Sequence, residues 1–270
     1  MFLNNIKKKC ANKTQILVDF FDTVMFREVH SYQLMKQWEN ALKAKFPELY
    51  DINLSSIRKH AINAIGKEEC AIPYNVLLNN IYNQIKDLVS FSFEDFYDVS
   101  IQVDKYIDMA TQYPNKKILK VLKNLRKDGK SITLVTDYYL PAEVYNDYLS
   151  FFDLNGLFDE IICSSDLQLT KSNGELYEYL IARYGSPENM IMIGDSEESD
   201  YKNAKKYGID AIRYFPFAHK VKTNIRLRTG YKFKEYAAKN INKKCYTDTL
   251  FDEYGINLCY FSRDLYKEAK

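Results

Sequence analysis

The pattern of hydrophobic and polar positions predicts an alternation of buried strands and amphipathic helices. Short apolar runs each end at a polar residue, which is typical of strands buried on both faces of a parallel sheet. The runs cover residues 15–18, 132–135, 160–163 and 190–193, and a fifth run at 211–215 fits a further strand. Segments with apolar residues at helical spacing follow or separate them, at 118–125, 144–152, 176–184 and 201–207. The alternation predicts an α/β fold with a Rossmann-like, doubly wound parallel sheet.

The stretch from residue 26 to residue 112 interrupts this alternation directly after the first strand. It shows helical periodicity and no convincing strand, and Met35, Trp38 and Leu42 share its first apolar face. We interpret this stretch as an inserted, all-helical cap of about four helices. The predicted organisation is a core formed by 1–25 and 113–216, a cap formed by 26–112, and a helical C-terminal extension over 217–270.

The predicted extension is basic. Between Lys220 and Lys244 it carries nine lysines or arginines against one acid, Glu235. A solvated basic helix face explains this run better than a surface for acidic lipids, nucleic acid or another polyanion. The whole chain has a formal net charge of only +2. Charge therefore indicates no class of partner, and we expect no nucleic acid.

Composition and cysteine usage favour a cytoplasmic globular protein. The chain has 270 residues, of which 46% are hydrophobic, enough for a core with a smaller inserted domain. Its five cysteines are scattered without a CxxC pair, and three histidines are too few for a zinc site. Such cysteines are typical of reduced thiols in the cytosol. We expect neither a secretory signal nor a transmembrane segment, because no apolar stretch is long enough.

Polar residues that directly follow the apolar runs should meet at one edge of the sheet, because open α/β sheets bind ligands beyond the carboxyl ends of their strands. The residues gathered by this rule are Asp19, Phe21, Asp22, Thr23, Thr136, Asp137, Lys171, Asp195 and Asp200. Carboxylates this close repel one another unless a cation lies between them. Mg²⁺ takes carboxylate, carbonyl and water oxygens and bridges to phosphate. The sequence therefore predicts a site for magnesium and phosphate.

The predicted reaction is covalent catalysis by a carboxylate. Asp19 attacks a phosphoryl group and passes through an aspartyl-phosphate, while the metal neutralises charge between the two anions. Lys171 adds a positive charge to the phosphate. The Thr136 hydroxyl and the backbone N–H of Asp137 hold phosphate oxygens. Asp19, Thr136 and Lys171 are thus the predicted catalytic residues.

Four motifs carry this chemistry, in the order DFFDTV, LVTD, LTK and GDSEESD. Together they resemble the four motifs of the haloacid dehalogenase (HAD) superfamily. The resemblance implies that Asp19 is the nucleophile and that Mg²⁺ is bound by Asp19, the backbone carbonyl of Phe21 and Asp195. It implies that Asp200 helps through water or through Lys171, and that the helical insert is a C1-type cap.

The motifs resemble more closely a bacterial subgroup of this superfamily that is encoded beside or fused to glycosyltransferases of surface-polysaccharide loci. The matching segments are DFFDTV at 19–24 with Arg27, TDYYLP at 136–141, SSD at 164–166 with TK at 170–171, and GD at 194–195 with SD at 199–200. The likeness spans residues 16 to 214. It implies a glycosyltransferase partner, a role in polysaccharide biosynthesis, and a small phosphorylated substrate such as a sugar phosphate.

One position departs from the phosphatase pattern. Phosphatases of the superfamily typically carry a second Asp two residues after the nucleophile, which protonates the leaving oxygen; here that position is Phe21. Asp22 comes one residue later, and a shift of one residue along an extended chain turns the side chain the other way. We therefore interpret Asp22 as structural. Loss of a general acid costs about two to four orders of magnitude in rate.

Several explanations of Phe21 stay open. The substrate has a good leaving group, such as an acyl or anomeric phosphate; or the cap or the substrate supplies the acid; or the protein is a weakly active phosphate-binding module that partners a glycosyltransferase. A dehalogenase is a further alternative, because halide needs no proton, although the acids near Asp195 favour a metal. In the cap, Arg27, His30, Arg58 and Glu69 are candidates for selecting the substrate, and Arg27 is the best of them.

Overall fold

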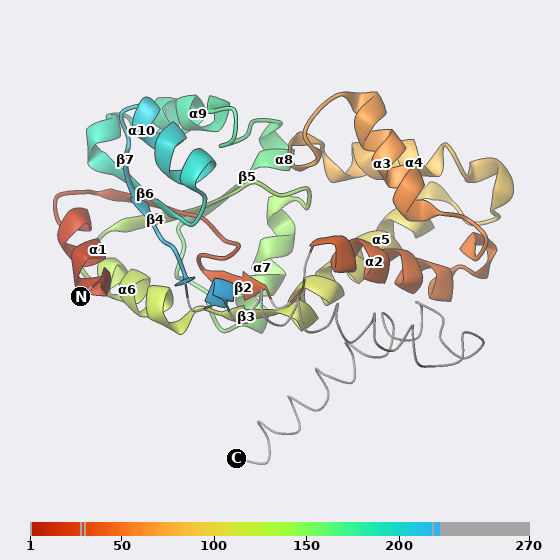
Figure 1. The fold of residues 1–270 in the computed structure, drawn as a ribbon, viewed down its shortest axis with the longest axis horizontal. Helices are drawn as coiled ribbons and strands as arrows, with labels where there is room; N and C mark the ends of the chain where they lie inside the picture. The colour runs from red at the N-terminus through yellow and green to blue at the C-terminus, as the bar shows by residue number, and fades with distance from the viewer. Residues whose placement is uncertain (1, 28, 30, 218, 222–270) are drawn as a thin grey trace, which may run out of the picture.

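The computed structural model describes residues 2–27, 29, 31–217 and 219–221. A five-stranded parallel sheet with the order β5-β4-β1-β6-β7 forms the centre of the larger body (Figure 1). Its strands are β1 Gln15–Val18, β4 Ser131–Thr136, β5 Glu160–Cys163, β6 Met190–Gly194 and β7 Asp210–Arg213. The first strand pairs with β4 on one side and with β6 on the other. The predicted doubly wound parallel sheet is confirmed.

Helices cover both faces of the sheet, because successive strand residues point to opposite faces. Ile16 and Val18 belong to a core that includes apolar side chains of α1, α6 and α7, whereas Leu17 belongs to a second core with α9 and α10. The helices of the body that contains the sheet are α1 Phe2–Cys10, α6 Lys116–Lys127, α7 Ala142–Phe151, α8 Ser164–Leu167, α9 Glu175–Tyr184 and α10 Ala204–Lys206. Helix α1 was not among the elements predicted from the sequence.

Four further helices form a second body, on the right in Figure 1. They are α2 Ser31–Lys45, α3 Leu54–Ile65, α4 Tyr74–Tyr82 and α5 Phe93–Thr111, with short 3₁₀ turns between them at Pro47–Leu49, Glu69–Ala71 and Lys86–Leu88. A reciprocal capping box between Ser92 and Asp95 starts α5. None of the helices within the described ranges has the length and apolar character needed to cross a membrane.

The stretch interpreted as free of strands begins and ends in strand, which corrects that expectation. Strand β2, Met25–Arg27, pairs antiparallel with β3, Gln112–Pro114. The pair of β2 and β3 links the two chain segments that connect the central sheet with the cap helices. Three residues are too few to show an alternating pattern, so sequence periodicity misses such strands.

Two further boundaries differ from the expectation. The fifth strand of the sheet ends at Arg213 rather than at residue 215. The helical segment predicted at 201–207 begins as a π-helical turn, Glu197–Asn203, and continues as α10. The division into core, cap and extension stays a prediction, and residues 222–270 of the predicted extension lie outside the described residues.

Buried acids on α5 hold the cap helices against the core through tyrosine hydroxyls. Asp108 accepts hydrogen bonds from Tyr138 at 2.9 Å and from Tyr148 at 2.8 Å. Tyr138 lies in the loop after β4, and Tyr148 lies on α7. The contact therefore joins a cap helix to a loop that carries predicted site residues.

Asp104, one turn earlier on α5, makes an equivalent contact. It accepts hydrogen bonds from Tyr74 at 2.7 Å and from Tyr139 at 3.2 Å. Burial raises the pKa of Asp104 from 3.8 to about 6, although the nearby Arg58 and the tyrosine hydrogen bonds oppose the rise. The folded protein therefore binds a proton at Asp104 more tightly than the unfolded chain does.

Asp104 should make stability depend on pH. Its folded-state pKa is raised, so its contribution is fully present below pH 3.8 and is lost as the pH rises through about 6. A rise of about two pKa units corresponds to about 3 kcal/mol. Urea unfolding from pH 4 to pH 7 should show wild-type stability falling by up to about this amount relative to Asp104→Asn. Parallel profiles for the two proteins would contradict this assignment; Asp98→Asn, an exposed acid on the same helix, is the control.

Candidate active site

The carboxyl ends of β1 and β6 bring two of the predicted acids together. Asp19 directly follows β1, and Asp195 directly follows β6. The two strands are neighbours, and the backbone N–H of Asp19 donates to the Ile193 carbonyl at 2.9 Å. Both acids therefore lie at the edge of the sheet where open α/β folds bind ligands.

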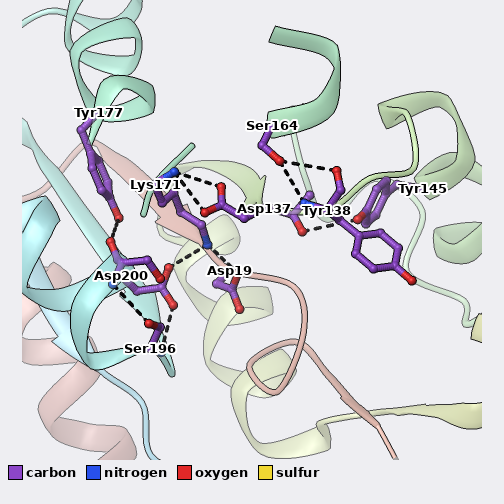
Figure 2. A network of polar contacts seen from close by, with 11 residues as sticks. Asp19, Asp137, Tyr138, Tyr145, Ser164, Lys171, Tyr177, Ser196 and Asp200 are labelled. Atoms are coloured by element: carbon purple, nitrogen blue, oxygen red, sulfur yellow. Dashed lines mark hydrogen bonds and ion pairs between the residues drawn. The ribbon is translucent and has the colours of Figure 1, made fainter. Parts of the chain in front are cut away.

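A buried lysine joins Asp19 to a third acid, Asp200. The Lys171 ammonium donates to Asp19 at 2.6 Å and to Asp200 at 2.7 Å (Figure 2). Asp19 is 7% exposed, Lys171 2% and Asp200 1%. Carboxylate oxygens of Asp19, Asp195 and Asp200 lie within 4.8 Å of one another. Four of the predicted site residues are thus brought together.

Negative charge dominates this cluster. Burial raises the pKa of Asp19 well above its ordinary value; Lys171 opposes the rise, while Asp200 and Asp195 add to it. Burial is also the main cause of the raised pKa of Asp195. For Lys171, burial favours the neutral amine, but Asp19, Asp200 and Asp137 together raise its pKa well above the ordinary value. The lysine is therefore cationic, and a further cation would relieve the repulsion among the acids.

Asp200 reaches the cluster from the π-helical turn Glu197–Asn203. A π-turn carries one more residue than an α-turn, so it changes the direction in which a side chain leaves the helix. The Asp200 carboxylate accepts the backbone N–H of Ser196 at 3.0 Å. A Cβ at Gly194 would collide with this carboxylate. The glycine of the GDSEESD motif is therefore needed to make room for its last acid.

Asp137 braces the loop that carries Lys171. Its two carboxylate oxygens accept the backbone N–H of Lys171 at 3.0 Å and 3.1 Å. Burial raises the pKa of Asp137, and Lys171 opposes the rise. Figure 2 shows Asp137 directed toward Lys171 and the Tyr138 ring directed away from it. The backbone N–H of Asp137, predicted to bind phosphate, is separate from this brace.

Thr136 is fully buried at the end of β4, and its hydroxyl lies 3.4 Å from the Tyr145 hydroxyl. This side-chain contact is directed to α7 and not to Asp19 or Lys171. A phosphate contact of Thr136 stays a prediction, and so does a metal contact of the Phe21 carbonyl.

Phe21 and Arg27 lie together beside the cluster. The Arg27 guanidinium carbon is 3.5 Å from the centroid of the Phe21 ring, and the Phe21 and Tyr138 rings have centroids 4.4 Å apart. Within the described part of the chain, Arg27 forms no ion pair with an acid. Arg27 is therefore placed on the Phe21 ring and not in the acid cluster, so its predicted phosphate contact is not part of this arrangement.

Asp22 is directed toward the segment that follows β7. Its backbone has a left-handed φ of 55°, and its carboxylate lies 3.6 Å from the His219 ring. Burial acts to raise the pKa of Asp22, but the hydrogen bond and charge of His219 outweigh it, so the pKa is lowered. An acid with a lowered pKa stays ionised and is a poor proton donor. The structural interpretation of Asp22 agrees with this geometry.

The other cap candidates are paired with each other or lie outside the described residues. Arg58 is 1% exposed, and its guanidinium contacts the Glu69 carboxylate at 2.7 Å and 2.8 Å. His30 lies outside the described residues. Arg58 and Glu69 therefore offset each other's charge within the cap.

Sequence reasoning missed two contacts at the cluster. The Lys220 ammonium lies 2.7 Å from Asp195. On the cap side, Glu68 accepts a hydrogen bond at 2.7 Å from Ser172, the residue after Lys171. Both contacts join segments far apart in the chain. The basic run beginning at Lys220 was visible in the sequence, but its position against Asp195 was not.

The donor set fits Mg²⁺. Three carboxylates lie close enough to share an ion, and carboxylate oxygens are preferred ligands of this metal. Asp19 and Asp195 would hold the ion, because both carboxylate oxygens of Asp200 already accept hydrogen bonds, from Lys171 and from the Ser196 backbone, whereas Lys171 binds only one oxygen of Asp19. Two lysines neutralise only part of the charge of the acids, so the site is electrostatically suited to a divalent cation.

Lys171 should be essential for stability. Replacing it by Met leaves Asp19 and Asp200 buried without their cation, a change that costs about 3–5 kcal/mol when a buried pair loses one partner. Urea unfolding of Lys171→Met in metal-free buffer should show this loss. Lys202→Met, which removes an exposed ion pair with Glu198, should leave the unfolding midpoint nearly unchanged. Equally small losses in both variants would show that the buried contacts are not stabilising the fold.

Solved structures share this fold at low sequence identity. A 2-haloacid dehalogenase from Pseudomonas syringae pv. Tomato DC3000 is 15% identical, with 75% of this chain and 86% of that chain covered and a TM-score of 0.56. A HAD family enzyme from Bacteroides thetaiotaomicron is 12% identical, with 78% and 98% covered and a TM-score of 0.52. A variant of that enzyme in complex with magnesium and inorganic phosphate is 13% identical, with 74% and 93% covered and a TM-score of 0.50.

Sequence comparison is decisive at the level of the family. No curated protein matches the chain. The sequence profile described as haloacid dehalogenase-like hydrolase matches residues 16–214, which include every motif of the acid cluster. The chain therefore belongs to the haloacid dehalogenase-like hydrolases.

Proposed function

We propose that this protein is a Mg²⁺-dependent phosphohydrolase in which Asp19 is the nucleophile. The observation that carries the proposal is the cluster of Asp19, Asp195 and Asp200 within 4.8 Å, with Lys171 buried against two of them. Dehalogenation needs no divalent cation, so it gives no reason to bury three acids together. Phosphoryl transfer does, because an anionic nucleophile must approach an anionic phosphate.

Each residue has a role in the proposed reaction. One Asp19 oxygen forms a bond to phosphorus, and the bond from phosphorus to the leaving oxygen breaks with its electron pair going to that oxygen. Lys171 and the backbone N–H of Asp137 stabilise the phosphoryl oxygens. Water then hydrolyses the aspartyl-phosphate and releases inorganic phosphate. Magnesium, held by Asp19 and Asp195, would supply charge neutralisation between the two anions.

Phe21 restricts the leaving group. Phe21 stands at the sequence position where phosphatases of the superfamily carry the proton-donating Asp, and its ring is covered by Arg27 at 3.5 Å. A substrate whose leaving oxygen is stable as an anion, such as an acyl phosphate or an anomeric sugar phosphate, avoids the need for that proton. We therefore propose a small phosphorylated metabolite of this kind. A glycosyltransferase partner and a cytoplasmic location rest on the sequence features alone.

Replacing the nucleophile should abolish hydrolysis without unfolding the protein. Wild-type protein with Mg²⁺ should release phosphate from acetyl phosphate or a sugar 1-phosphate, and Asp19→Asn should lower the rate by at least about a thousandfold. Asp22→Asn is the matched control and should retain activity, because Asn tolerates the left-handed backbone at that position.

Other results would favour the alternatives. Metal-independent halide release from 2-chloropropionate would identify a dehalogenase. Absence of turnover with every phosphate ester and haloacid would favour a phosphate-binding module. Full phosphatase activity of Asp19→Asn would reject the assigned nucleophile.

Magnesium should compete with Lys220 for Asp195. Binding to the folded state raises the thermal midpoint in proportion to ln(1 + [Mg²⁺]/Kd). Because Lys220 lies 2.7 Å from Asp195, Lys220→Met should lower severalfold the Mg²⁺ concentration needed for a given rise of the thermal midpoint. Asp195→Asn should abolish the stabilisation. An unchanged wild-type midpoint at millimolar Mg²⁺ would exclude a metal site at these acids.

A further inference from the structure

A small cavity lies between the cap helices and the loops of the candidate active site. Its volume is about 80 Å³, and its walls include Arg27, Trp38, Arg58, Glu69, Tyr138 and Tyr139. Arg27 comes from β2, the tyrosines from the loop after β4, and the other three from the cap. The cavity therefore lies where the cap meets the core.

The cavity walls present buried hydrogen-bond donors that have no acceptor. The unsatisfied buried atoms of its lining residues are Nε and Nη2 of Arg27, Nε1 of Trp38 and Nη2 of Arg58. Nη2 of Arg58 lies 2.7 Å from Glu69 but without hydrogen-bond alignment. All four atoms are donors, and none of the unsatisfied atoms of the lining residues is an acceptor. The missing group must therefore supply acceptors only.

Arginine offers a specific geometry for such a group. Nε and Nη2 lie on one edge of the guanidinium and form the fork that binds a carboxylate or a phosphate with two parallel hydrogen bonds. The Arg27 guanidinium carbon lies 3.5 Å from the centroid of the Phe21 ring, and this contact restrains the position of the fork. The indole N–H of Trp38, which is 1% exposed, adds a third fixed donor.

The acids near the cavity are already bound by other groups. Asp104 accepts hydrogen bonds from Tyr74 and Tyr139, and Glu69 is paired with Arg58. Arg27 is the charged lining residue that has no ion pair within the described ranges. The charge of the buried Asp108 acts on Arg27, but Nε and Nη2 of Arg27 still have no hydrogen-bond acceptor, and an oxyanion would supply one.

The cavity is also connected with the proposed phosphate site through the chain. Phe21, beneath Arg27, lies two residues after Asp19, and Tyr138 directly follows Asp137. The loop after β4 thus carries both Asp137 of the proposed phosphate site and tyrosines of the cavity wall, while Phe21 contacts Arg27 of that wall. A cavity of about 80 Å³ is larger than a single water needs, so it has room for one oxyanion group.

We propose that this cavity binds a second oxyanion group of the substrate, a carboxylate or a second phosphate. This inference rests on the proposed function, because it places the first phosphate at Asp19. The substrate is then a phosphorylated acid or a bisphosphate, with its transferred phosphoryl group at the acid cluster and its other anion on Arg27 and Trp38. Arg27 selects the substrate and takes no part in bond breaking.

Matched ligands test the proposal in the Asp19→Asn variant, which binds without turnover. Calorimetry with Mg²⁺ compares glucuronic acid 1-phosphate with glucose 1-phosphate, and glucose 1,6-bisphosphate with glucose 1-phosphate. In at least one pair, the ligand with two anionic groups should bind at least tenfold more tightly than the ligand with one. The pair that shows this difference tells whether the second group in the cavity is a carboxylate or a phosphate. Adding Arg27→Gln should remove the preference and leave the affinity for the other member unchanged. Arg183→Gln, an exposed arginine on α9, is the control.

A second readout keeps the test independent of the folding of the Arg27 variant. Trp38 is the only tryptophan of the chain, so its fluorescence reports on the cavity wall directly. The preferred ligand should change this fluorescence, and Trp38→Phe should weaken its binding severalfold by calorimetry. Equal affinities within both pairs, or an equal loss for both members in the variants, would overturn the proposal.

The two proposals fail in different ways. If only the cavity assignment is wrong, Mg²⁺-dependent phosphate release persists without any preference for doubly anionic ligands. If only the phosphohydrolase assignment is wrong, phosphate release is absent, but acetate or inorganic phosphate still changes the Trp38 fluorescence of the wild-type protein and fails to do so in Arg27→Gln.

Discussion

The ion pair from Lys171 to both Asp19 and Asp200 is the contact on which the site depends. Three acids gathered at one edge of a parallel sheet repel one another, and burial increases the cost of each charge. A single buried lysine joins two of them and leaves the third, Asp195, to another cation. Asp137 fixes the backbone of that lysine, and Gly194 leaves room for Asp200. The local structure around the cluster thus serves to hold opposite charges in place.

The charge of the acid cluster also bears on the proposed reaction. An acid cluster with incomplete compensation is stabilised when a further cation joins it, and Lys220 already lies 2.7 Å from one carboxylate oxygen of Asp195. Phe21 replaces the acid–base group that many phosphatases place beside their nucleophile. The leaving oxygen of the substrate must therefore be stable without being protonated. In the proposed hydrolase, bond cleavage consequently depends on a good leaving group in the substrate and not on a general acid of the protein.

The cap joins this chemistry through a layer of tyrosines, acids and guanidinium groups. Asp104 and Asp108 bind tyrosines of the loop after β4, while Arg27 lies on Phe21 in the loop after β1. These contacts tie the position of the cap to the two loops that carry the proposed phosphate site. The proposed selection of the substrate by the cap and its proposed placement at Asp19 would therefore be coupled through packed side chains.

The sequence by itself determined the parallel sheet, the helical insert and the membership of Asp19, Lys171, Asp195 and Asp200 in one site. Buried strands are apolar throughout, and polar residues at their carboxyl ends must converge, so local pattern is sufficient for these features. Only the tertiary structure decided that Arg27 lies on Phe21 away from the acids, that Lys220 contacts Asp195, and that β2 and β3 pair. Those contacts join residues distant in the chain through side-chain directions, which periodicity does not encode.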